Sequence, residues 1–296
     1  MNLLTDSQVA QILLHRPDLI RDAVLEALVE QGADQVRQKK TSLRKKDDGP
    51  ASDRLTSMMG FVGNPPRVVG FKLIGSGSCN SAMGMPRASV LIVLCEPGTH
   101  ALRHIVAGTS ISLQRTAEIA VLGIELLEPN ARKIAVVGNG ALARAIIPCI
   151  RRRIEAVKDT ITYGRADLAR LGKSRSISAD VVITATSADS PILMDSNLKG
   201  VRLVVNLGLR ELASDTIAAF DEHIVDDLTS CAAQTTPFAE ALRSKLILKE
   251  DVYQLSAVLN SLSRINAEKR IYFQPSGMVS IDLLAAAKIL EAAIAE

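Results

Sequence analysis

A glycine turn between a strand pattern and a helix pattern constrains the fold of this chain more than any other feature. It lies in the stretch Lys133–Arg153, KIAVVGNGALARAIIPCIRRR, where four apolar residues run into Gly138-Asn139-Gly140 and then into a helix-forming sequence. A buried strand that turns through glycines into a helix exposes backbone N–H groups and the positive end of the helix dipole. That arrangement can hold a pyrophosphate, and it predicts a βα unit of the Rossmann type.

The spacing inside the turn is that of a dinucleotide-binding motif. In the pattern GxGxxA, Gly138 would make the tight turn, Gly140 would let the backbone approach the phosphates, and Ala143 would let helix and strand pack closely. Further Val/Ile-rich runs without polar alternation, typical of parallel strands, follow at 159–164, 179–187 and 201–208. We therefore predict an α/β fold with a Rossmann domain. The expected cofactor contacts in it are Gly138, Asn139, Gly140, Ala141, Leu142, Arg165, Thr186, Ser187 and Leu207.

The end of the second strand favours NADP(H) over NAD(H). An NAD site usually places Asp or Glu there, where it accepts hydrogen bonds from the ribose hydroxyls. Here the strand DTITYG is followed by Arg165, whose guanidinium suits a 2′-phosphate. Asp167 is close enough that NAD(H) stays possible, and a solvent-facing arginine at a helix start is the alternative for Arg165.

Length and composition indicate a soluble protein with two domains of ordinary size or one large α/β domain. The chain has 296 residues, of which 47% are hydrophobic and 23% charged, so it can bury a packed core. No apolar run approaches the roughly 18 residues of a membrane span. The first residues carry Asp6 and amphipathic spacing, whereas a signal peptide needs a basic start and an unbroken apolar core. We expect a cytoplasmic protein that does not bind a membrane.

Charge and cysteine usage argue against a nucleic-acid partner and a metal site. The net charge is only +3, aromatics make up 3%, and tryptophan is absent, so the stretches RQKKTSLRKK and RRR are expected to be solvated helix ends and loops. The four cysteines form no CxxC pair, and the four histidines have no metal-ligand spacing. We expect buried or half-buried reduced thiols and no metal.

Outside the Rossmann unit the pattern is mixed. Helices are expected before residue 35, and a polar, basic segment follows them. Strands are expected at 55–62, 67–75 and 88–96, and helices at 110–127, 238–265 and 280–296. We predict an α+β domain formed by 1–118 and 272–296. The Rossmann domain would span 119–271.

This order of elements, together with two segments, resembles the ornithine cyclodeaminase/mu-crystallin family. The segments are GFKLIGSGSCNSAMGMPRASVLIVL, with its G-x-K run and asparagine, and SISLQRTAEIAVLGIELL, with its R-T-A helix. The stretches MPRAS, LGLREL, IVDD and QPSGMVSIDL look most like the branch of the family that makes 2,3-diaminopropionate.

The resemblance assigns roles to five residues. It implies that Arg44, Lys72 and Arg115 surround the α-carboxylate and the reacting carbon of an amino-acid substrate, and that Arg87 lines the same cavity. It also implies that Thr116 contacts the cofactor phosphates. A buried carboxylate needs charged partners, and burial would lower the pKa of Lys72 enough for proton transfer. A snorkelling edge-strand lysine at 72 and a satisfied interface arginine at 115 are the alternatives.

One departure bears on the reaction. Ornithine cyclodeaminases carry an acidic residue in the loop that here reads NLGLREL, where no aspartate precedes Glu211. Cyclisation of ornithine is therefore not expected. Asp226 and Asp227 are the nearest replacement acids, with Asp227 the catalytic candidate; solvated carboxylates at a strand end are the alternative.

The resemblance implies a homodimeric NAD(P)-dependent oxidoreductase acting on the C–N bond of an amino acid or its imine. It also implies that the domain 1–118 and 272–296 binds the substrate and forms the dimer. Its most specific form oxidises N-(2-amino-2-carboxyethyl)-glutamate, and water then releases 2,3-diaminopropionate. An NADPH-dependent imino-acid reductase or an ornithine cyclodeaminase-like enzyme is the alternative. A mu-crystallin-like protein that binds NADPH and a small ligand without turnover is an alternative of another class.

Overall fold

The computed structural model describes residues 2–44, 53–261 and 268–295. The chain forms two compact units. Unit 1 comprises Met1–Arg115 and Met278–Glu296, and unit 2 comprises Thr116–Gly277. The sequence-based prediction puts the two limits at 118 and 271, a few residues away from these.

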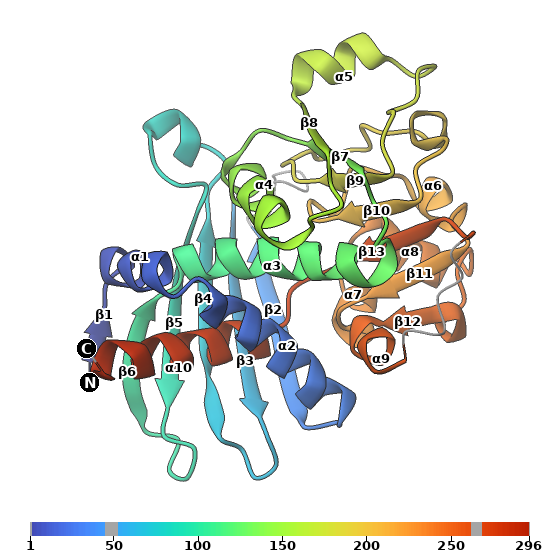
Figure 1. Cartoon of the computed structure of the whole chain (residues 1–296). Helices are drawn as coiled ribbons and strands as arrows, with labels where there is room; N and C mark the ends of the chain where they lie inside the picture. Colours follow the sequence, from blue (N-terminus) through green and yellow to red (C-terminus); the bar gives the residue numbers. More distant parts are fainter. Residues whose placement is uncertain (1, 45–52, 262–267, 296) are drawn as a thin grey trace. The chain divides into compact units, whose positions relative to one another are not determined.

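Unit 1 is a six-stranded sheet with helices on one face (Figure 1). In spatial order its strands are β1 (Asn2–Leu4), β6 (Leu102–Ala107), β5 (Ala88–Cys95), β4 (Val68–Ser76), β3 (Arg54–Val62) and β2 (Val36–Arg44). Among the described strand pairs of this sheet, β1–β6 is parallel and the others are antiparallel. The helical elements are α1 (Asp6–His15), α2 (Asp18–Gly32), η1 (Asn80–Met83), the start of α3 (Thr109–Leu127) and α10 (Val279–Ala295).

The inner face of this sheet packs directly against the last helix of the chain. Helix α10 contacts β3, β4 and β5, and it also packs on α2. At Gly70 a Cβ atom would stand 2.2 Å from the carbonyl oxygen of Val93 and 2.9 Å from the side chain of Leu283. Only glycine leaves room there, so β4 lies close to α10 along its inner face.

The outer face of the same sheet is apolar and exposed. Strand pairing aligns Leu43 with Leu55, and Leu73 with Leu91, on the face away from α10. Leu43 is 72% exposed and Leu55 is 65% exposed. These four leucines line a hollow of about 590 Å³.

Unit 2 is a seven-stranded parallel sheet (Figure 1). In spatial order its strands are β12 (Val252–Gln254), β11 (Glu222–Val225), β13 (Ile271–Gln274), β10 (Leu203–Asn206), β9 (Val181–Thr184), β7 (Lys133–Val137) and β8 (Asp159–Tyr163). The helical elements are α4 (Ala141–Arg153), α5 (Arg165–Leu171), η2 (Asp195–Leu198), α6 (Ser214–Ala218), α7 (Leu228–Ala232), α8 (Pro237–Arg243), η3 (Lys249–Asp251) and α9 (Leu255–Asn260). This parallel sheet confirms the predicted α/β Rossmann fold.

The chain reverses its direction across the sheet at β7. After β7 it runs through α4 to β8 on one side, and then through α5 to β9 on the other. Ligands of open parallel sheets bind outside the carboxyl ends of the strands at such a reversal. Gly138 follows β7 at this position.

The helix and strand predictions are partly right. The strands at 55–62, 67–75 and 88–96 and the helices at 110–127 and 280–296 are confirmed within a few residues. The stretch predicted as helical at 238–265 contains α8 and α9, but β12 interrupts it and pairs with β11. Its residues 262–265 lie outside the described residues. The predicted strand runs do not include β1, β2, β6, β11, β12 or β13.

The cysteines differ in their exposure. Cys95, Cys149 and Cys231 are buried, but Cys79 is exposed, so the expectation of four buried or half-buried thiols is wrong there. Across the described residues, no helix has the length and apolar character to cross a membrane.

Candidate functional site

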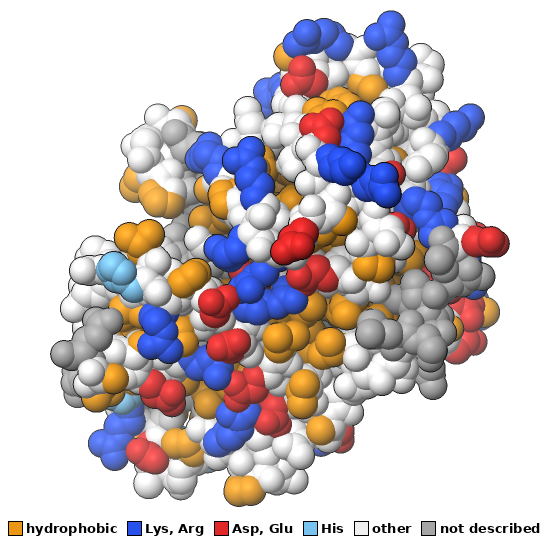
Figure 2. Space-filling model, viewed as in Figure 1, with side chains coloured by type: hydrophobic (Ala, Val, Ile, Leu, Met, Phe, Trp, Pro, Cys, Tyr) orange, Lys and Arg blue, Asp and Glu red, His pale blue; other side chains and the backbone are white. Residues whose placement is uncertain are grey.

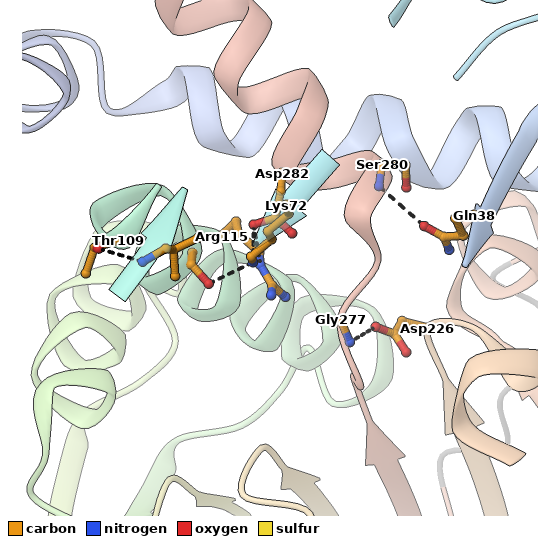
Figure 3. Close-up of polar contacts among 10 residues, drawn as sticks. Gln38, Lys72, Thr109, Arg115, Asp226, Gly277, Ser280 and Asp282 are labelled. Atoms are coloured by element: carbon orange, nitrogen blue, oxygen red, sulfur yellow. Dashed lines mark hydrogen bonds and ion pairs between the residues drawn. The ribbon is translucent and has the colours of Figure 1, made fainter. Parts of the chain in front are cut away.

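Lys72 lies at the centre of a buried charged cluster in unit 1. Its side chain points from β4 toward α10, is 0% exposed, and places Nζ 2.6 Å from Oδ1 of Asp282. Nζ also donates to the hydroxyl of Ser112 at 2.9 Å. Arg115 on α3 places Nε 3.2 Å from the same Asp282 oxygen (Figure 3). The structure thus brings together two predicted cations, Lys72 and Arg115, through a carboxylate that was not predicted.

The environment lowers the pKa of Lys72 to about 7. Burial is the largest cause, because a charged ammonium loses its hydration. The charge of Arg115 lowers the pKa further, whereas Asp282 raises it. An amine with this pKa can both give and take a proton near neutral pH. The alternative of a snorkelling edge-strand lysine is wrong, because β4 is an interior strand and the side chain is fully buried.

The inner face of unit 1 carries further cations on its first strands. Lys40 aligns with Met58, which aligns with Lys72, so the two lysines share a face. Four residues after Lys40 on β2, Arg44 aligns with Arg54 of β3 and lies on the same face.

Arg87 lies just before β5, at the end of the loop that contains η1. Its carbonyl oxygen accepts hydrogen bonds from the N–H of Gly77 and the side-chain amide of Asn80. These two bonds fix the backbone of the loop at Arg87.

The glycine turn of unit 2 has the geometry that its sequence predicts. Gly138 has a φ of 124°, and a Cβ there would lie 2.4 Å from the carbonyl oxygen of Ala185. Gly140 precedes α4, and a Cβ on it would meet no protein atom within 4 Å. Helix α4 begins without a side-chain cap, so the N–H groups of its first turn are available to an anion. Ala143 is buried against the sheet.

The other predicted cofactor contacts of this turn are exposed or half-buried. Asn139 and Ala141 are exposed and Leu142 is half-buried, while Thr116 is half-buried on α3. The carbonyl oxygen of Asn139 accepts a hydrogen bond from Arg144 at 3.0 Å. Exposed backbone at this turn is what a site for a dinucleotide pyrophosphate requires.

The tip of β8 carries both Arg165 and Asp167. Arg165 is exposed at the start of α5. Asp167 turns back and accepts a hydrogen bond from the N–H of Gly164 at 2.9 Å, and it pairs with Arg170 at 3.2 Å. Lys and Arg side chains gather over α5 and the segment after it (Figure 2). The exposed cations in that region are Arg165, Arg170, Lys173 and Arg175.

A buried glutamate connects the loops after β9 and β10. Oε1 of Glu211 accepts hydrogen bonds from the N–H and the hydroxyl of Thr186, at 3.1 and 2.7 Å. Oε2 accepts from the N–H of Arg210 at 3.1 Å. A Cβ on Gly208 would lie 1.9 Å from Glu211, so the loop that contains Leu207 closes tightly around this carboxylate.

Sequence reasoning noted Glu211 only as the residue after a missing aspartate. Its role depends on contacts 25 residues apart along the chain. Ser187, next to Thr186, is exposed at the same edge of the sheet.

The acids after β11 are buried rather than solvated, so that alternative is wrong. Asp227 caps α7: its Oδ1 accepts from the N–H of Ser230 at 3.0 Å and its Oδ2 from the hydroxyl of Ser230 at 3.1 Å. Asp226 is fully buried and accepts from the N–H groups of Ser276 and Gly277. Burial raises the pKa of Asp226. The predicted catalytic role of Asp227 stays a prediction, and its carboxylate has a structural use.

The basic run of α4 meets a buried glutamate. Arg152 pairs with Glu118 at 2.5 Å and Arg153 pairs with it at 3.7 Å.

Within the described ranges, no group of three or more metal-ligating side chains comes together.

The model of the ornithine cyclodeaminase/mu-crystallin family matches residues 4–171, more than half of the chain. The chain belongs to this family. The resemblance found in its sequence is therefore confirmed at the family level.

Two similar proteins are a dehydrogenase and a reductase. The chain is 23% identical to N-((2S)-2-amino-2-carboxyethyl)-L-glutamate dehydrogenase of Staphylococcus aureus, over 97% of this chain and 93% of the relative. It is 28% identical to Delta(1)-pyrroline-2-carboxylate reductase 1 of Burkholderia multivorans, over 53% of this chain and 56% of the relative. These relatives confirm the predicted enzyme class, an oxidoreductase.

A solved structure shares the fold over the whole chain. It is Delta(1)-pyrroline-2-carboxylate reductase of Thermococcus litoralis in complex with NADH and L-proline. The TM-score is 0.84 at 17% identity, with 100% of this chain and 98% of the other covered. The fold of this family member is thus that of a reductase whose structure holds a nicotinamide dinucleotide.

Proposed function

We propose that this chain is an NAD(P)-dependent oxidoreductase that acts on the C–N bond of an amino acid or its imine. The observation that carries the proposal is the buried Lys72–Asp282–Arg115 cluster, in which a lysine with a pKa of about 7 lies beside an arginine. An arginine can bind the substrate carboxylate, and a lysine with that pKa can exchange a proton with the substrate nitrogen.

The most specific form of the proposal is the oxidative hydrolysis of N-(2-amino-2-carboxyethyl)-glutamate. Hydride leaves the glutamate α-carbon, the nitrogen loses its proton, and an imine forms; water then adds to the imine carbon and the C–N bond breaks. The products are 2,3-diaminopropionate, 2-oxoglutarate, NAD(P)H and a proton. The bound dinucleotide supplies the acceptor for the hydride. Lys72 would take the proton from the nitrogen, and Arg115 would hold a carboxylate.

The charge of the inner face supports a substrate with more than one carboxylate. Besides Lys72 and Arg115, the face carries Lys40, Arg44 and Arg54 on β2 and β3. A cyclic imino acid such as pyrroline-2-carboxylate has a single carboxylate, whereas the diaminopropionate precursor has three. Arg44 would bind one of the additional carboxylates, and Arg87 would line the same cavity.

The residues of unit 2 fit a dinucleotide. Gly138 and Gly140 leave the backbone open, and the first turn of α4 has free N–H groups for the pyrophosphate. Thr116, Thr186, Ser187 and the Leu207 loop would hold the rest of the cofactor. We propose NADP(H) as the preferred form, because Arg165 is exposed where a 2′-phosphate would bind.

The cofactor preference supports a second candidate, a reductase of imino acids that uses NADPH. Reduction would add hydride to the C=N carbon, and Lys72 would give its proton to the nitrogen. The same residues serve both candidates, so substrate and direction separate them.

The outer face of unit 1 supports a homodimer. It presents a contiguous group of exposed leucines, and an exposed apolar patch of this kind marks an interaction surface. A second copy of the chain is the occupant, since an identical face is equally apolar and needs the same cover.

Two parallel absorbance assays test the function. One offers NADP⁺ or NAD⁺ with N-(2-amino-2-carboxyethyl)-glutamate, and the other offers NADPH or NADH with pyrroline-2-carboxylate or piperideine-2-carboxylate. Production of reduced cofactor in the first assay is the expected result. Consumption in the second alone would favour the reductase. Lack of turnover in both assays, with tight cofactor binding, would favour a binding protein.

A further inference from the structure

Two fully buried aspartates of this chain differ in what they contact. Asp226 accepts hydrogen bonds from the N–H groups of Asp227, Ser276 and Gly277 and from the hydroxyl of Ser276. Both carboxylate oxygens of Asp226 therefore accept hydrogen bonds from uncharged N–H or hydroxyl groups. Asp282 is equally buried, but its partners are the charged groups of Lys72 and Arg115.

Asp282 contacts cations through one oxygen only. Its Oδ1 lies 2.6 Å from Nζ of Lys72 and 3.2 Å from Nε of Arg115, while its Oδ2 is buried without a hydrogen-bond partner in the described part of the chain. A half-satisfied buried carboxylate costs stability that apolar packing would not cost. Helix α10 is otherwise strongly apolar around this residue. Packed apolar residues in place of the whole Lys72–Asp282–Arg115 cluster would serve the stability of the fold as well, so stability alone does not account for the cluster.

We propose that Asp282 is a positioning residue for Lys72. It holds Nζ at a fixed place on the inner face of unit 1 and sets how readily that nitrogen carries a proton. This inference rests on the proposed function, because Lys72 is the proton-transfer group of that reaction. The last helix of the chain would thus supply part of the reaction machinery.

The charged groups that face Lys72 come from three elements, α10, α3 and β2. Asp282 on α10 favours the charged amine, whereas Arg115 on α3 and Lys40 on β2 disfavour it. The aligned neighbours on β3 and β5 are Met58 and Ile92, which add no charge. Asp282 is therefore the carboxylate that counters these positive charges.

An NMR titration with ¹³C-labelled lysine, on the full ligand-free chain, reads Lys72 directly. The Lys72 resonance is assigned by its loss in Lys72→Arg. In Asp282→Asn the pKa of Lys72 should fall by about one to three pH units, since an opposite charge at this distance has an effect of that size. In Arg115→Met the pKa should rise. Glu26→Gln is the matched control, because it breaks an ion pair to Lys288 of α10 without touching the cluster.

The kinetic readout is the pH dependence of kcat for the wild type and Asp282→Asn. Its inflection should move to lower pH together with the Lys72 resonance, while Glu26→Gln moves neither. An unchanged Lys72 titration in Asp282→Asn would overturn the proposal, and so would a kinetic inflection that stays in place when the resonance moves. If the wild type turns over none of the substrates, the proposed function fails, and the titration still decides whether Asp282 controls Lys72.

Discussion

Oε1 of Glu211 accepts two hydrogen bonds from Thr186, one from its backbone N–H and one from its hydroxyl. This pair joins the loop after β9 to the loop after β10. Both loops carry residues that the sequence assigns to the cofactor. Their relative position therefore depends on one buried carboxylate.

The substitution Glu211→Gln should weaken dinucleotide binding. The amide nitrogen of glutamine would face the N–H of Arg210, so a donor would meet a donor and the loop would shift. Loss of one such bond at a buried site costs about 1.4 kcal/mol, or a tenfold rise in Kd. Titration of cofactor by fluorescence measures this, with Glu240→Gln, an exposed residue of α8, as the control. An unchanged Kd would show that the loops do not depend on this carboxylate.

The substitution Asp227→Ala should lower the free energy of unfolding and leave kcat of the folded protein unchanged. Loss of an N-cap costs about 0.5–2 kcal/mol, because the N–H of Ser230 loses its acceptor. Denaturant unfolding measures the stability, and kcat of the folded variant measures the chemistry. A fall of kcat by a hundredfold or more in folded protein would support the predicted catalytic role of Asp227 instead.

The substitution Arg165→Gln should raise the KM for NADPH by about 10- to 100-fold and leave the KM for NADH unchanged. A charge-assisted hydrogen bond to a phosphate is worth about 1.5–3 kcal/mol, which gives this range. Arg170→Gln on the same short helix is the matched control, since that guanidinium is paired with Asp167. Equal KM values for both cofactors in the wild type would count against NADP(H) preference.

Lys72 should make stability depend on pH. Its pKa is about 7 in the folded chain and 10.5 in an unfolded one, so between these values the unfolded chain binds more protons. The free energy of unfolding should therefore rise with pH in this window, by up to about 1.4 kcal/mol per pH unit. Urea unfolding of the wild type and Lys72→Met at pH 7, 8 and 9 isolates the contribution, because other groups cancel in the difference. A difference that does not change with pH would contradict the low pKa.

Charged residues on the outer face of unit 1 should break the dimer. Leu55→Lys combined with Leu73→Lys puts two cations into the exposed leucine group, and in a symmetric interface each substitution occurs twice. Light scattering at micromolar concentration should show a dimer for the wild type and a monomer for the variant. Leu246→Lys, at an exposed leucine of unit 2, should stay dimeric. A monomeric wild type would disprove the interface.

The glycine turn was predictable because its chemistry is local. Gly138, Gly140 and Ala143 lie within six residues, and the backbone geometry of the turn follows from them. Lys72 and Arg115 were found through the resemblance to the family. Asp282 was not found, since its partner Lys72 is 210 residues away along the chain. The sequence pointed to Asp282 only as a single aspartate in the apolar run SIDLLAAAKIL.

The missed strand β2 has a related cause. Its inner positions carry Lys40 and Arg44 where an ordinary strand would carry apolar residues, so the usual alternation is lost. The stretch predicted as helical at 238–265 contains a strand for a different reason. Val252 packs into the core as part of β12, and pairing with β11 overrides the local helical pattern.

The division of unit 1 between the two ends of the chain has a consequence for biosynthesis. Residues up to Arg115 are synthesised before unit 2, but the helix that covers β3, β4 and β5 is synthesised after it. Until α10 emerges, Lys72 has no carboxylate beside it and the inner face of the sheet has no cover. This face therefore stays exposed to aggregation throughout the synthesis of unit 2. A premature stop before α10 would leave both the core of unit 1 and its charged cluster incomplete.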